Sequence, residues 1–196
     1  MPDIPLRCRC GRIRGLARAV SPPSGFRFIC YCTDCQAFAR TLERPDVLDP
    51  AGGTDIFHMP AAHVTLTEGA DALRCLSFSG KVLRWYADCC RTPMANGAAT
   101  PRFPIVALIH SFMDCAAAGG SRDALLGPPL CRIYERSATG PLRPNELPPP
   151  SLRLFARRAT KLVGWWMRGL ARPNPFFDDF AKAPRSAPQL LSRRAD

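Results

Sequence analysis

The sequence has no hydrophobic run long enough to cross a membrane, although 46% of its 196 residues are hydrophobic. Residues 1–14 also lack the apolar segment of a secretory signal peptide. Without such a signal, we expect a cytoplasmic protein whose ten cysteines stay reduced rather than forming disulfides. No repeat of solenoid period is present. The length therefore predicts one medium-sized domain with an extension.

Acidic residues are the second shortage. The chain has 16 Asp and Glu against 27 Lys and Arg, a net charge of +11 that favours anionic partners in general. Eleven of the basic residues but only four of the acidic ones lie in residues 141–196. The proline-rich residues 141–150 predict an extended linker. We therefore expect a domain over residues 1–140 that stays folded when residues 151–196 are removed.

Cysteine, by contrast, is abundant and clustered. Seven thiols fall in three groups: Cys8 and Cys10, then Cys30, Cys32 and Cys35, then Cys89 and Cys90. Thiolates hold zinc well, and Cys32 and Cys35 have the two-residue gap of a zinc knuckle. Core or disulfide cysteines are the alternative, and a redox CxxC would need a βαβ context that is not visible. Three such groups favour metal binding. The isolated Cys75, Cys115 and Cys131 predict buried, inert thiols.

The pattern of apolar residues predicts mainly β structure. Short apolar or alternating runs between turn residues are expected to form strands over residues 13–20, 26–29, 56–59, 64–67, 73–78, 82–86, 104–110 and 130–134. One short helix is expected over residues 33–42, and its N-terminus beside the thiols would favour their charged form. The predicted fold class is thus a mainly β domain pinned by metal.

The order of these thiols resembles that of the GFA family, which is named for glutathione-dependent formaldehyde-activating enzyme and includes centromere protein V. The matching residues are Cys8, Cys10 and Gly11, then Cys30, Cys32 and Cys35, then Cys90, Thr92 and Pro93, within residues 5–115. The resemblance implies a β-tent of small antiparallel sheets and two zinc ions. The CxC pair and the late cysteines would close a structural site. Cys30, Cys32 and Cys35 would hold a catalytic zinc with one position left for substrate or solvent.

The late motif departs from the CxxCG pattern of that family. Cys90 matches its second cysteine, but Ala87 stands at the first and Arg91 at the glycine. Cys89 is adjacent to Cys90, and successive side chains on a strand point apart. Cys89 could complete the structural site if the chain bends there, or it could point to the other zinc. We therefore expect a divergent member of the family.

Other candidate residues carry weaker signals. The histidines, His58, His63 and His110, have no metal-like spacing, and His58 is the one expected to come nearest a site. A substrate carboxylate could be held by Arg27, Arg40 or Arg84, and the sequence selects none of them.

Residues 151–172 predict a basic amphipathic helix that starts at Ser151 and stops at Pro173. Its apolar stripe comprises Leu152, Phe155, Ala159, Leu162, Val163, Trp166 and Leu170, and the opposite face holds Arg153, Arg157, Lys161, Arg168 and Arg172. The helix could dock on the β domain, lie on an anionic membrane surface or, as the least favoured choice, bind nucleic acid. In the tail, residues 173–196, an apolar segment at residues 174–178 precedes a stretch expected to be loose from residue 181.

Two functions fit the sequence. In the first, an open zinc position at Cys30, Cys32 and Cys35 binds a small thiol or a glutathione adduct, as a carbon–sulfur lyase requires. In the second, both zinc ions are structural, and the basic helix of a binding module contacts a membrane, a protein or nucleic acid. An open coordination position favours the enzyme, and a closed one favours the binding module.

Overall fold

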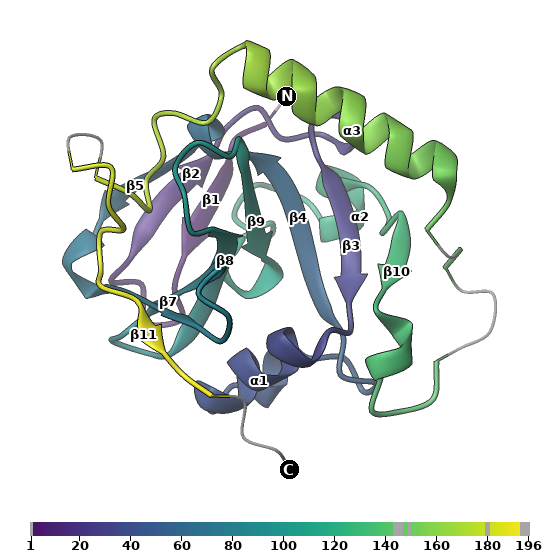
Figure 1. Cartoon of the computed structure of the whole chain (residues 1–196), viewed down its shortest axis with the longest axis horizontal. Coiled ribbons are helices and arrows are strands. Elements are labelled where there is room, and N and C mark those ends of the chain that lie inside the picture. Colours follow the sequence, from purple (N-terminus) through teal and green to yellow (C-terminus); the bar gives the residue numbers. More distant parts are fainter. Residues whose placement is uncertain (1, 143–146, 149, 179–180, 193–196) are drawn as a thin grey trace.

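The computed structural model describes residues 2–142, 147–148, 150–178 and 181–192. These residues form a mainly β fold with eleven strands in two sheets and three α-helices, which confirms the predicted fold class (Figure 1). The strands are β1 (Ile4–Arg7), β2 (Arg14–Ala17), β3 (Phe26–Cys30), β4 (Thr54–Pro60), β5 (Val64–Glu68), β6 (Leu73–Ser77), β7 (Val82–Ala87), β8 (Thr92–Ala98), β9 (Ile105–Ile109), β10 (Cys131–Ile133) and β11 (Gln189–Leu190). The helices are α1 (Thr33–Thr41), α2 (Arg122–Leu126) and α3 (Leu152–Met167).

The two sheets differ in size. The smaller sheet is antiparallel with the order β1-β2-β5, and the larger has the order β10-β3-β4-β9-β8-β7-β6-β11. All pairs in the larger sheet are antiparallel except β10 with β3 and β11 with β6. These two short parallel strands come from the C-terminal half of the chain and pair with strands that would otherwise be sheet edges. The larger sheet therefore has more strands than the small antiparallel sheets that the GFA resemblance implies, and two of its strand pairs are parallel.

Both faces of the larger sheet are covered, as the fully buried strand β4 shows. Phe57 and Met59 belong to a core shared with the smaller sheet, whereas Ile56 belongs to a second core with α1 and Trp165 of α3. This split follows from the alternation of side chains along a strand. In Figure 1, α1 and α3 lie at opposite ends of β3 and β4. The second core is therefore closed by one helix at each end.

The predicted helix over residues 33–42 is confirmed as α1. Cys32 is its N-cap and accepts a hydrogen bond from the backbone N–H of Cys35 at 3.4 Å. Asp34 in the first turn complements the helix dipole. Phe38 and Ala39 are buried against the sheet. The helix thus fixes two of the clustered thiols relative to the end of β3.

The predicted C-terminal helix forms, but it ends earlier than expected, and of the predicted apolar stripe only Leu162 and Leu170 pack against the core. Ser151 caps α3 by accepting from the N–H of Leu154, and the helix ends at Met167, before Gly169 with φ +69° rather than at Pro173. Trp165 is the residue it buries. The side chains of Leu152, Phe155, Val163 and Trp166, which belong to the predicted apolar stripe, are exposed.

Cation–π contacts explain the docking face of α3. The guanidinium of Arg158 lies 5.6 Å from the ring centre of Phe28, and the ammonium of Lys161 lies 5.1 Å from that of Phe26. The Lys161 ammonium also donates to the carbonyl of Pro23. Two residues near the basic side of the helix therefore face the sheet, and the adjoining apolar stripe turns outward.

The C-terminal segment is part of the fold. Phe176 and Phe177 are buried, with ring centres 5.3 Å and 6.2 Å from that of Trp85. The strand β11 pairs with β6, and the thiol of Cys75 donates to the carbonyl of Ser186. The expectation of a loose chain from residue 181 is therefore wrong for the paired residues, and residues 193–196 lie outside the described part. Because Trp165, Phe176 and Phe177 fill the cores, we no longer expect residues 1–140 to keep full stability alone.

Within the described residues, none of the helices combines the length and the apolar character that a membrane crossing needs. The linker prediction for residues 141–150 falls partly outside the described part, which omits residues 143–146 and 149.

Candidate metal centres

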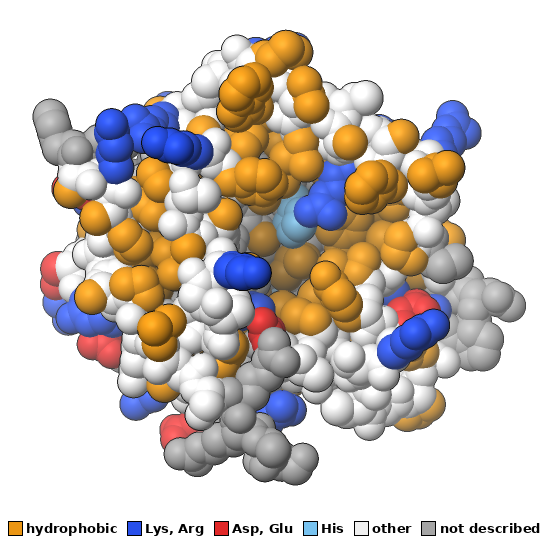
Figure 2. Space-filling view, in the orientation of Figure 1, with side chains coloured by type: hydrophobic (Ala, Val, Ile, Leu, Met, Phe, Trp, Pro, Cys, Tyr) orange, Lys and Arg blue, Asp and Glu red, His pale blue; other side chains and the backbone are white. Residues whose placement is uncertain are grey.

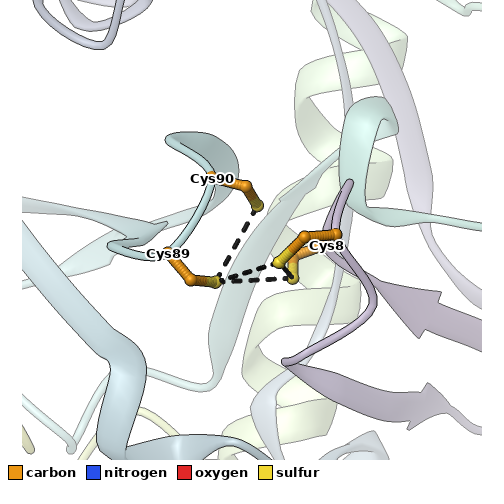
Figure 3. Close-up of side chains that lie close together, drawn as sticks. Cys8, Cys89 and Cys90 are labelled. Atoms are coloured by element: carbon orange, nitrogen blue, oxygen red, sulfur yellow. Dashed lines mark hydrogen bonds between the residues drawn. The ribbon is translucent and has the colours of Figure 1, made fainter.

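The first group of thiols, the outer set, comprises Cys8, Cys10, Cys89 and Cys90. Their four sulfur atoms all lie within 4.8 Å of one another. Cys8 and the pair Cys89–Cys90 point toward one another from two separate loops (Figure 3). The sulfur–sulfur distances are 3.6 Å for Cys8–Cys10, 3.3 Å for Cys10–Cys89 and 3.9 Å for Cys8–Cys89. Tetrahedral zinc with bonds of about 2.3 Å places its sulfur ligands about 3.8 Å apart, so this set fits the ion.

Two tight turns build the outer set. Cys8 and Cys10 follow β1, where Gly11 adopts φ +80° and the N–H of Ile13 donates to the Cys8 sulfur at 3.2 Å. Cys89 and Cys90 lie between β7 and β8, and the next residue, Arg91, has φ +56°. That left-handed conformation favours glycine, the residue that the GFA pattern has there. Because the strand has ended, the chain bends and the thiol of Cys89 joins the same set as Cys90.

Thr92 stabilises one thiolate of the outer set. Its hydroxyl oxygen accepts from the N–H of Arg9 at 3.0 Å and from Arg44 at 3.3 Å, which leaves the hydroxyl proton for the Cys90 sulfur at 3.1 Å. Burial opposes ionisation of Cys90, but the hydrogen bonds from Thr92 and from Cys10 outweigh it and lower the pKa of Cys90 to about 6. Burial raises the pKa of Cys8. The set therefore carries a thiolate near neutral pH before any metal binds.

The second group, the inner set, comprises Cys30, Cys32 and Cys35. Cys30 ends β3, Cys32 caps α1 and Cys35 lies in the first turn of that helix. The three sulfur atoms lie within 4.8 Å of one another, with Cys30 and Cys35 3.7 Å apart. No fourth histidine, cysteine, aspartate or glutamate of the described residues completes this set. The inner set fits zinc with three ligands, and the outer set fits it with four.

Hydrogen bonds within the inner set separate the acidities of its thiols. The hydrogen bond from Cys30 has the largest effect on Cys32 and that from Cys35 the next largest. Together they lower the pKa of Cys32 to about 2, and the charge of Arg84 lowers it as well. The hydrogen bond to Cys32 raises the pKa of Cys30. Cys32 is also the most exposed of the three thiols. The most acidic thiol of the inner set is thus also the one that is partly exposed to solvent.

The buried Arg84 of β7 is the cation beside the inner set. Its guanidinium lies 3.5 Å from the Cys35 sulfur, 3.1 Å from the side-chain oxygen of Asn96 and 3.4 Å from a carboxylate oxygen of Asp34. The aromatic rings of Phe38 and Phe78 lie 5.9 Å from the guanidinium carbon. Three thiolates and a divalent ion would carry one net negative charge, and Arg84, which also pairs with the carboxylate of Asp34, is the cation beside it.

The structure separates the three arginine candidates. Arg27 lies on the opposite side of β3 from Cys30, where it binds the carboxylate of Asp55 at 2.7 Å and the carbonyl of Gly127. Arg40 is exposed and lines a cavity of about 640 Å³ together with Phe78 and Tyr86. Only Arg84 contacts a clustered thiol. Sequence reasoning did not identify its partners Asp34 and Asn96, because they lie on other elements, α1 and β8.

The remaining candidates lie away from both sets. All ten cysteines are free thiols, and Cys75, Cys115 and Cys131 are buried singly, outside both groups. The His110 ring contacts the backbone carbonyl of Asp55 at 3.3 Å. His58 is buried on β4 and belongs to neither set.

A sequence model of the Family of unknown function (DUF6151) matches residues 2–184, so the chain belongs to this family. No curated protein matches the chain. The matched range includes α3 and the buried Phe176 and Phe177, as well as both cysteine sets. The unit defined by the family thus agrees with a fold in which the C-terminal segment completes the core.

Proposed function

We propose that this DUF6151 protein binds two zinc ions and that the inner one serves a carbon–sulfur lyase-type reaction on a thiol or its adduct. One observation carries the proposal: the outer set offers four sulfur ligands, whereas the inner set offers three beside a buried arginine. Structural zinc sites have four protein ligands, and catalytic sites keep one position open. The resemblance of the cysteine order to the GFA family supports the same assignment.

The reaction class follows from the chemistry of a thiol–aldehyde adduct. When its carbon–sulfur bond breaks, the electron pair goes to sulfur, and the hydroxyl proton leaves to solvent as the carbonyl forms. Zinc, when bound, supplies a Lewis acid that stabilises the released sulfur as a thiolate. Arg84 contributes a fixed positive charge next to Cys35, and Phe38 and Phe78 exclude water around it. The reverse reaction joins a thiol to an aldehyde.

Metal content of cysteine variants tests the two roles. The reduced, unchelated protein should contain about two zinc ions per chain, one for each set. Cys32→Ser should lose about one ion and keep its circular dichroism spectrum, because the inner set joins neighbouring residues. Cys10→Ser should unfold or aggregate, because the outer set joins β1 to the turn after β7, and zinc affinity there is folding free energy.

A matched control for these variants is Cys115→Ser, a buried cysteine outside both sets, which should keep both ions. If Cys32→Ser unfolds as Cys10→Ser does, both sites are structural and the lyase proposal fails. A zinc content near zero in the unaltered protein would refute the metal assignment as a whole.

A second candidate function is docking of α3 on an anionic membrane surface. Leu152, Phe155, Val163, Trp166 and Met167 of this helix are all more than half exposed. An outward stripe of this kind, next to the exposed basic residues Arg153, Arg157 and Arg168, is typical of helices that lie in a lipid headgroup layer.

Vesicle binding tests this second function. At low salt the protein should sediment with vesicles that contain phosphatidylserine and stay unbound with phosphatidylcholine alone, because the arginines supply the attraction. Trp166→Ala should weaken binding, whereas Phe112→Tyr, a change inside the core, should leave it unaltered if the protein stays folded. Equal binding to both vesicle types, or no binding to either, would refute the membrane function.

A further inference from the structure

One face of the molecule is hollowed at its centre, over β4 and β9 and between α1 and α3 (Figures 1 and 2). Figure 2 shows hydrophobic side chains around this hollow, with a histidine and a basic side chain at its edge toward α3. Strand register assigns a row of residues to the side of the sheet that carries Cys30: Thr54, Ile56, His58, Ala107, Asn96 and Arg84. The inner set therefore lies at the α1 end of the hollow.

His58 and Arg158 close the α3 end of the hollow. The guanidinium of Arg158 lies 3.2 Å from Nδ1 of His58, and the ring of His58 packs edge-on against Phe28, 5.3 Å between centres. Burial, and then the charge of Arg158, lower the pKa of His58 to about 3, so the imidazole is neutral at pH 7 and accepts this hydrogen bond. Within the described residues, Arg158 therefore has neutral and aromatic partners and no carboxylate.

The floor of the hollow has a small side chain between two polar ones. Ala107 lies between His58 and Asn96 in the same cross-strand row, and its methyl group is the smallest side chain there. These three residues keep 6–8% exposure, whereas the neighbouring Leu108, on the other side of the sheet, has 0%. The sheet is therefore slightly less covered at these three residues than on its other side.

Three buried polar atoms around the hollow have no hydrogen-bond partner among the described residues: Thr54 Oγ1, Arg84 Nε and Arg158 Nε. Thr54 is directly opposite Cys30, Arg84 contacts Cys35, and Arg158 contacts His58. Buried polar groups in folded proteins are nearly always hydrogen-bonded to protein, water or ligand. Their gathering around one hollow makes it a place where water or a polar ligand would find hydrogen-bond partners.

We propose that the hollow binds a thiol compound that carries a carboxylate, with the carboxylate at Arg158 and the sulfur toward the inner set. Only the position of the ligand's sulfur rests on the proposed function; the position of the carboxylate does not. A partly buried arginine without an acidic partner among the described residues favours a carboxylate ligand. Neutral His58 offers Arg158 no negative charge, so the arginine remains available to an anionic ligand.

The spacing within the sheet sets the length of the ligand. Cys30 and Phe28 are two residues apart on β3, which separates their Cα atoms by about 7 Å. The guanidinium of Arg158 lies 5.6 Å from the Phe28 ring centre. Arg158 also contacts His58, which lies opposite Phe26, four residues or about 13 Å along β3 from Cys30. A ligand that reaches from the inner set to Arg158 therefore needs on the order of 7–13 Å between its sulfur and its carboxylate.

Two matched thiols test the inference on the zinc-loaded protein. Calorimetry would compare 6-mercaptohexanoate with the neutral 6-mercaptohexanol, and NMR would follow the ring signals of His58, one of only three histidines. The carboxylate compound should bind at least about tenfold more tightly, as a charge-assisted hydrogen bond predicts. It should also shift the His58 signals. Hexanoate, which has no thiol, tests Arg158 without the inner set.

The variant Arg158→Gln should lose the preference for the carboxylate, whereas Arg157→Gln, its exposed neighbour on α3, should keep it. Equal affinity of the unaltered protein for the two thiols would overturn this inference and leave the proposed function standing. Failure of both thiols to bind would refute the proposed function. In that case, hexanoate would test whether Arg158 binds a carboxylate. A shift of the His58 NMR signals that disappears in Arg158→Gln would support this carboxylate site, and the absence of any shift in the unaltered protein would overturn it. If Arg158→Gln does not fold, the comparison of the thiols in the unaltered protein still decides.

Discussion

Replacing Phe176 by alanine tests whether the C-terminal segment belongs to the core. The Phe176 side chain is 2% exposed and its ring lies 5.3 Å from the ring of Trp85. Truncation of a fully buried phenylalanine costs about 3–5 kcal/mol, which includes the cavity left behind. The interplanar angle of 30° gives an aromatic contact that such a truncation also removes. We therefore expect the free energy of unfolding to fall by about 4 kcal/mol.

Urea unfolding of the reduced, zinc-loaded protein measures this loss. With a slope of about 2–3 kcal/mol per molar urea, the midpoint should fall by roughly 1.5–2 M. The control is Phe155→Ala, the same truncation on α3 at a side chain that is 67% exposed, which should change stability by less than about 0.5 kcal/mol. A loss below about 1 kcal/mol for Phe176→Ala would refute the account, because the segment would then be an attachment that the domain does not need.

Three further predictions follow from buried polar and backbone contacts. Asp55→Asn should cost about 3–5 kcal/mol in urea unfolding, because it leaves two arginine partners, at 2.7 Å and 2.8 Å, without their carboxylate. The exposed ion pair of Asp71 offers the control, and Asp71→Asn should leave the urea midpoint nearly unchanged, because solvent screens exposed charges. Because the pKa of His58 is lowered to about 3, its contribution to stability is present above pH 6.5 and lost as the pH falls toward 3. In His58→Asn, the free energy of unfolding should therefore fall less steeply between pH 6.5 and pH 3, by up to about 1.4 kcal/mol per pH unit. If its pH dependence is the same as in the unaltered protein, the buried imidazole is not the cause of the loss. Gly15→Ala should lower the thermal midpoint by several degrees, since its Cβ would lie 2.1 Å from the carbonyl oxygen of Thr65 across β2 and β5, and a normal midpoint would show that the strands can separate at no cost.

The sequence alone determined the features that depend on neighbouring residues. Apolar alternation and turn residues predicted the β6–β7 hairpin and the buried strand β9. The capping pattern placed the start of α3 directly after Ser151. For α1 it predicted Thr33 or Asp34 near the start, whereas the N-cap is Cys32. Strands β1 and β8 were missed, because proline in the first, and proline, asparagine and glycine in the second, lower their β-propensity. Packing between neighbouring strands overrides that propensity.

The tertiary structure alone decided which distant residues meet. The turn between β7 and β8 brings Cys89 into the outer set, because a left-handed Arg91 bends the chain where a continuous strand would separate the two thiols. Pairing of β7 with β8 sets Arg84 opposite Asn96, beside the inner set, and so selects one arginine of three. The ring of Phe26 contacts Lys161 and so helps to set which face of α3 packs on the sheet, which leaves most of its predicted apolar stripe exposed. Such contacts depend on strand register and on which aromatic faces are open, and these are set by the whole fold rather than by local sequence.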